Sequence, residues 1–112
     1  MALFEKFNRV STVREGIDLG SMEFKNIRDF AGQTIYVDGF FFTRGKYGEQ
    51  VVVVGNGYKI NMPNKAVEDF KKMMSDKPTL EAILNGQLTI TSIYVRNTPR
   101  GNIVNYTYKD KQ

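Results

Sequence analysis

The chain has 112 residues, with 16 basic and 12 acidic side chains, a net charge of +4 and 41% hydrophobic residues. This length suits one domain with a single hydrophobic core. His and Cys are both absent, which excludes disulfides, thiolate nucleophiles, imidazole bases and Cys/His sites for zinc or haem. We therefore expect a binding protein without cofactor or metal, and not an enzyme.

No apolar run approaches the roughly 20 residues that span a bilayer. The segment Met1 to Val10 carries charged residues among its apolar ones, so it lacks the uninterrupted apolar core of a secretory signal. These patterns predict a cytoplasmic protein.

The first strand-rich block covers residues 34–62. β-branched and aromatic residues predict strands over 34–43, 49–54 and 58–62. A loop over 44–48 and a tight turn at Gly55-Asn56-Gly57 would join them into a meander. Gly39 lies in the middle of the first strand and predicts a bulge, which would let that strand curve around a barrel.

The middle of the chain has helical periodicity. Apolar residues three and four positions apart predict a helix over 64–74 and a shorter one over 78–84. A second strand-rich block follows, with strands predicted over 87–96 and 103–108 and a turn between them at 97–102. Residues 1–23 would form an N-terminal extension, in which Phe4, Phe7 and Val10 pack on the domain or meet another subunit.

The predicted order is therefore β-β-β-α-β-β. This is the order of the OB-fold, a mainly β, partly open five-stranded Greek-key barrel that binds oligonucleotides or oligosaccharides through strands 2 and 3 and the 1-2 and 4-5 loops. We expect one such domain over residues 1–112, with its core at about 24–108 and its helix between strands 3 and 4.

The charge is unevenly distributed along the chain. Residues 33–62 and 86–112 hold seven basic and three acidic side chains, so 7 − 3 gives the whole +4, whereas the remainder holds nine of each. Positive charge concentrated on strands attracts polyanions, of which nucleic acid is the commonest. Solubility is the simpler explanation, and charge alone does not decide between them.

Basic and aromatic side chains alternate in the same blocks. In a groove for single-stranded nucleic acid, cations follow the phosphates and rings stack on bases. Many aromatic residues in strands simply fill a core, so each ring could either pack in the core or stack on a base. In the third strand, Lys59 and Asn61 point away from Tyr58 and Ile60, which favours the groove for them. The candidate nucleic-acid-binding residues are Tyr36, Phe42, Arg44, Lys46, Tyr47, Lys59, Asn61, Tyr94, Arg96, Arg100, Tyr106 and Tyr108.

Several stretches of the chain are similar to a known family: Phe30 to Phe40, Lys46-Tyr47-Gly48, Tyr58 to Pro63, and Gly101 before the last strand. In these stretches the chain resembles small single-stranded DNA-binding proteins of phages and mobile elements of Gram-positive bacteria. The resemblance implies an OB-fold that coats DNA during replication or recombination, in the host cytoplasm if phage-encoded. It also implies a homo-oligomer, dimer or tetramer, with replication or recombination proteins as possible partners. Bacterial relatives recruit partners through an acidic tail, whereas this chain ends in a basic one.

Three other functions remain open. Single-stranded RNA could occupy the same groove, since stacking and phosphate contacts do not exclude a 2′-hydroxyl. The aromatic surface could instead serve protein contacts in a structural or assembly subunit. A catalytic function would need a carboxylate pair such as Asp38 and Glu49, for which no third ligand is evident.

Overall fold

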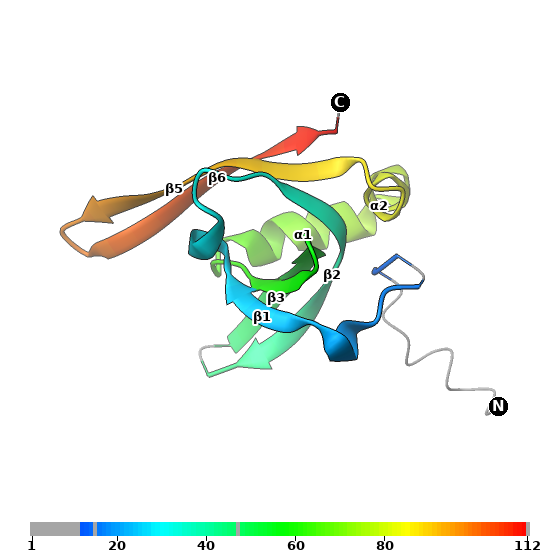
Figure 1. The fold of residues 1–112 in the computed structure, drawn as a ribbon, viewed down its shortest axis with the longest axis horizontal. Coiled ribbons are helices and arrows are strands. Elements are labelled where there is room, and N and C mark those ends of the chain that lie inside the picture. The colour runs from blue at the N-terminus through cyan, green and yellow to red at the C-terminus, as the bar shows by residue number, and fades with distance from the viewer. Residues whose placement is uncertain (1–11, 15, 47, 112) are drawn as a thin grey trace.

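The computed structural model describes residues 12–14, 16–46 and 48–111. It is a mainly β structure in which six strands form one sheet, curled into a half-barrel, with two helices packed against it (Figure 1). The strand order is β1-β4-β3-β2-β5-β6. The strands are β1 (Glu23–Asn26), β2 (Ile35–Gly45), β3 (Gly48–Gly55), β4 (Tyr58–Asn61), β5 (Leu88–Thr98) and β6 (Gly101–Asp110), and the helices are α1 (Ala66–Ser75) and α2 (Lys77–Leu84).

The five predicted strands and both helices are present, but the hairpins differ from the prediction. Asn56 and Gly57 form the expected tight turn between β3 and β4, with φ of 53° and 83°. The Asn56 amide also bonds the backbone of Thr34 and Tyr36, which ties this turn to the start of β2. Elsewhere the strands continue further than predicted: β2 and β3 stay paired as far as Gly45 and Gly48, and the loop over 97–102 shortens to a two-residue turn.

Strand β1 was not predicted. It pairs in parallel with β4, with Phe24 beside Lys59 and Asn26 beside Asn61. Asn26 also begins a short 3-10 helix, η3 (Ile27–Phe30), through a capping box with Asp29. The buried side chains of this helix fix the chain as it leaves β1.

The sheet has a core face and an outer face. Phe40, Val53 and Ile60 lie on the core face, where Phe40 packs on Phe70 of α1 with 4.9 Å between the ring centroids. The neighbouring residues in register, such as Lys59 and Asn61, lie on the outer face. No helix in the described ranges is long and apolar enough to cross a membrane.

The predicted bulge at Gly39 is confirmed, because the register of β2 against β3 shifts between Val37 and Gly39. An N-terminal segment, residues 12–14, lies along β2 at this point. Its backbone bonds join Phe40 N to Thr12 O and Arg14 N to Asp38 O. A Cβ at Gly39 would lie only 2.4 Å from the Cα of Val13, so the bulge needs glycine to admit this segment. The predicted apolar face of Phe4, Phe7 and Val10 falls outside the described residues.

Candidate nucleic-acid interface

The outer face of the sheet divides into a covered half and an open half. Val52 and Val54 of β3 belong to this face by register, yet both are fully buried, and Val13 stands over Gly39 beside them. The open half belongs to β4 and β1. Here Lys59 and Asn61 are half-buried and Phe24 is 56% exposed. A ligand on the outer face would therefore contact β1 and β4 and not the centre of β3.

A cavity of about 500 Å³ adjoins this open half, between the end of β1, the start of α1 and the strand β6. Its lining combines apolar side chains, amides and two cations, and no acidic residue contributes to it. The lining residues are Asn26, Arg28, Met62, Pro63, Lys65, Val95, Asn102, Ile103 and Val104.

Lys65 connects α1 to β6 at this cavity. Its ammonium group donates a hydrogen bond of 3.0 Å to the carbonyl oxygen of Val104 and lies 5.2 Å from the centroid of the Tyr106 ring. The Lys65 side chain is thereby held at the cavity, although the residue as a whole is exposed. A fixed cation beside apolar surface can bind a phosphate while a base or another planar group covers the apolar part.

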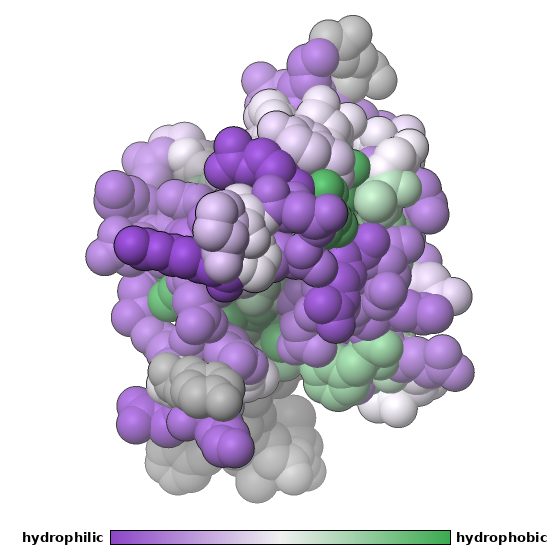
Figure 2. Space-filling view, turned by 90° about the vertical axis from the view of Figure 1, so that its left-hand side faces the viewer, coloured by the Kyte–Doolittle hydropathy of each residue, from purple (hydrophilic) through white to green (hydrophobic). Residues whose placement is uncertain are grey.

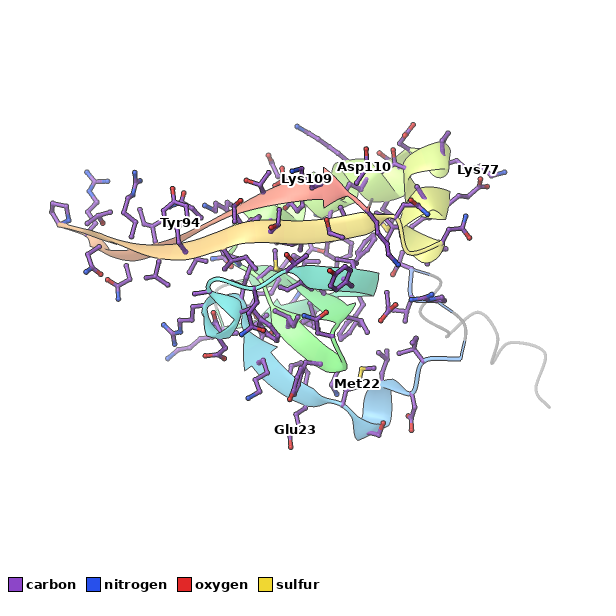
Figure 3. All side chains as sticks on the ribbon, turned by 45° about the horizontal axis from the view of Figure 1, so that its top comes forward. Met22, Glu23, Lys77, Tyr94, Lys109 and Asp110 are labelled. Carbon is purple, nitrogen blue, oxygen red and sulfur yellow. The ribbon has the colours of Figure 1, made fainter. Side chains whose placement is uncertain are left out.

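Strands β5 and β6 continue as a two-stranded arm, residues 94–105, which contributes Val95, Asn102, Ile103 and Val104 to the cavity and extends to the left in Figure 1. A hydrogen bond from Thr98 Oγ1 to the carbonyl oxygen of Gly101 closes the turn at its tip. Tyr94 is 53% exposed and lies along the arm in Figure 3, on the same face as Arg96 by register. Arg100 stands exposed at the tip.

The arm carries two arginines over residues 94–105 and no acidic residue. Figure 2 looks onto this end of the molecule, where hydrophilic side chains predominate and small hydrophobic patches lie between them. The β2–β3 hairpin, with Arg44 and Lys46 exposed, projects to the same side in Figure 1. The arm and the β2–β3 hairpin thus both carry exposed cations at this end of the molecule.

The structure does not bring all predicted site residues together. Arg44, expected in a loop, lies in strand β2, and Arg96, expected at the end of a strand, lies within β5. Phe42 faces the core and packs on Phe40, with 5.9 Å between centroids. Tyr47 lies outside the described residues.

Tyr36 lies apart from the basic hairpins. It begins β2, whereas Arg44 lies eight residues further on, or roughly 26 Å along the strand. The Tyr36 ring is 54% exposed, and the ammonium group of Lys111 lies 6.0 Å from its centroid. This pair borders a second, hydroxyl-lined pocket that includes Thr34 and Thr91.

Tyr106 and Tyr108, both predicted to bind nucleic acid, share one face of β6, and that face packs against α1. The two rings meet edge to face at 5.5 Å, and the Tyr108 hydroxyl donates a hydrogen bond of 3.0 Å to Asp69. Burial raises the pKa of both phenols, and the negative charge of Asp69 acts in the same direction. In this position the two rings stabilise the contact between the sheet and α1.

These raised pKa values predict a loss of stability in alkaline solution. The unfolded chain releases the Tyr108 proton near the ordinary pKa of 10, while the folded protein retains it. The folded state then binds more protons than the unfolded state, so stability falls as pH rises above about 10. The urea concentration at the midpoint of unfolding should fall between pH 9 and pH 11, and it should fall less for Tyr108→Phe than for wild type. For the exposed control Tyr36→Phe, the midpoint should fall as much as for wild type. An equal decrease in the midpoint of all three proteins would refute the prediction.

The carboxylates considered for catalysis are separate. Asp38 pairs with Arg14 of the N-terminal segment, and Glu49 pairs with Lys71 of α1. Glu49 is in register with Arg44, six residues from Asp38 along β2. Each carboxylate therefore belongs to its own ion pair.

Several residues of the cavity were missed by sequence reasoning, among them Asn26, Arg28, Lys65 and Asn102. Arg28 and Lys65 lie in the parts of the chain whose charges cancel overall. Asn26 precedes Asp29 by three residues, a capping pattern that can be read from sequence. Nothing local indicates that β1 pairs with β4, and this pairing is what brings Arg28 and Lys65 to one cavity.

No protein-family model, curated protein or solved structure matches the chain. The function therefore has to be inferred from the chemistry of these surfaces.

Proposed function

We propose that this protein binds single-stranded DNA without strong sequence preference, on an OB-fold. The strand pairing supports the fold, because β2 contacts both β3 and β5 and the helices lie between β4 and β5 in the chain. The half-barrel stays open between its two edge strands, β1 and β6, which both contribute residues to the cavity. A protein of this kind would act in the cytoplasm during replication or recombination.

One observation carries the proposal: the cavity combines Arg28 and Lys65 with apolar and amide surface, and no acidic residue lines it. An unpaired nucleotide offers a phosphate for the cations, a flat face for the apolar side chains of the lining, such as Val95 and its partner Val104, and polar edges for the amides. Duplex DNA keeps its bases stacked inside, so it does not offer the flat faces of its bases to such a cavity. The chemistry thus favours a single strand.

The arm extends this surface. Arg96 and Arg100 would contact phosphates beyond the cavity, while Tyr94 offers an exposed ring for stacking at roughly 1 to 3 kcal/mol per base. Contacts of this type tolerate any base, because each base has an aromatic face. Low sequence preference follows.

Competition measures the proposed preference directly. A fluorescein-labelled oligo-dT bound to the protein should be displaced by unlabelled oligo-dT or by a mixed-sequence strand at similar concentrations. Duplex DNA of the same length should compete much more weakly. Preferential displacement by a matched RNA strand would assign the site to RNA, and equal displacement by duplex would reduce the interaction to non-specific charge attraction.

A further inference from the structure

We propose that β1, a strand outside the five-stranded order, forms a base-stacking site at Phe24, beside Lys59. The inference rests on the proposed function and extends it to a segment that sequence reasoning placed at the border of the domain.

Phe24 is the most exposed large hydrophobic residue among those described, at 56%. It lies on a four-residue edge strand, a place where proteins normally avoid exposed apolar side chains because edges invite unwanted pairing. The core does not need the ring, since Phe24 points to the outer face. Such exposure suggests a contact with a ligand.

Lys59 supplies the charge that a nucleotide requires. Its ammonium group lies 4.3 Å from the centroid of the Phe24 ring, and the two residues are direct partners in the parallel register. An aromatic ring with an adjacent cation can stack on a base and bind the neighbouring phosphate. At Tyr36, another exposed ring, the nearby cation of Lys111 lies farther away, at 6.0 Å from the centroid.

Phe24 is continuous with the cavity. Asn26 lies on the same outer face, two residues or roughly 7 Å further along β1, and it lines the cavity. A single DNA strand that leaves the cavity past Asn26 would therefore reach Phe24 without crossing the covered part of the sheet at Val52 and Val54. The geometry points to one path that joins the two sites.

The chain contains no tryptophan, which permits a direct test. Phe24→Trp introduces a single indole at the proposed site, and Met74→Trp introduces one on α1 at a residue that is 41% exposed. On titration with oligo-dT, the emission of Phe24→Trp should be quenched with the same midpoint that anisotropy gives. The emission of Met74→Trp should not change.

Affinity provides a second measurement. Phe24→Ala should weaken binding of oligo-dT about tenfold, whereas Phe24→Tyr, which keeps a stacking ring, should bind within about twofold of wild type. The stacking site would be overturned if wild type binds oligo-dT, the emission of Phe24→Trp is not quenched and Phe24→Ala binds as tightly as wild type. That result would leave the proposed function standing. Unchanged DNA affinity with a smaller oligomer for Phe24→Ala in sedimentation would also overturn it, in favour of contact with a second copy. Wild type that fails to bind would overturn the proposed function itself.

Discussion

Replacement of four cations around the cavity and along the arm should reduce affinity for oligo-dT by two to three orders of magnitude at about 0.1 M salt. The variant changes Arg28, Lys65, Arg96 and Arg100 to Gln. Each phosphate contact on a single strand contributes a salt exponent of about 0.7, which corresponds to roughly fivefold in affinity between 1 M and 0.1 M salt. Four contacts then multiply to about 600-fold. Fluorescence anisotropy of a labelled strand measures the change.

The control removes cations from the helices. Lys72 and Lys77 are both exposed, and Figure 3 shows Lys77 at the opposite end of the molecule from Tyr94. Lys72→Gln combined with Lys77→Gln should weaken binding by no more than a few fold, through the change in net charge alone. If this double variant lost as much affinity per charge as the fourfold variant, binding would depend on overall charge and not on the cavity and arm.

The second large effect concerns stability. Gly39→Ala should lower the free energy of unfolding by roughly 2 to 3 kcal/mol, because a Cβ there would meet the backbone atoms Val13 Cα at 2.4 Å and Thr12 O at 2.6 Å. The segment would have to separate from β2 and lose two backbone hydrogen bonds and the pair between Arg14 and Asp38. A drop in melting temperature of roughly 10 °C follows for a domain of this size.

Gly20→Ala serves as the matched control for this glycine. Gly20 does not have a left-handed backbone, and an added Cβ would meet only Asp18 Oδ1, at an ordinary contact distance of 3.5 Å. Its melting temperature should stay within a few degrees of wild type. A Gly39→Ala variant as stable as Gly20→Ala would mean that the N-terminal segment contributes little to the folded state.

Local signals in the sequence predicted most of the fold. Asn56-Gly57 has the turn chemistry that a two-residue hairpin requires, and Gly39 marks the bulge where the N-terminal segment approaches. The alternation of Tyr58, Lys59, Ile60 and Asn61 correctly separated the core face from the outer face. These features depend on neighbouring residues, so a single sequence contains them.

The candidate interface was less predictable, because its residues come together through contacts between distant segments. Residues 23–26 are too short and too polar to indicate a strand, and only their pairing with β4 makes them one. The valines of β3 appear in the sequence as one apolar run, and nothing local shows that Val52 and Val54 are buried on the outer face too. Charge counted by region also missed Arg28 and Lys65, because their regions of the chain hold as many acidic as basic residues, whereas no acidic residue lines the cavity.

The most direct test of the central proposal is the affinity of the wild-type protein for oligo-dT at two salt concentrations. With contacts from the cavity and the arm, the slope of log K against log salt should be about −3, so affinity should fall roughly 60-fold between 50 and 200 mM salt. Stacking contacts should leave measurable binding at the higher concentration. Absence of binding by micromolar protein at 50 mM salt would contradict the proposal that this protein binds single-stranded DNA.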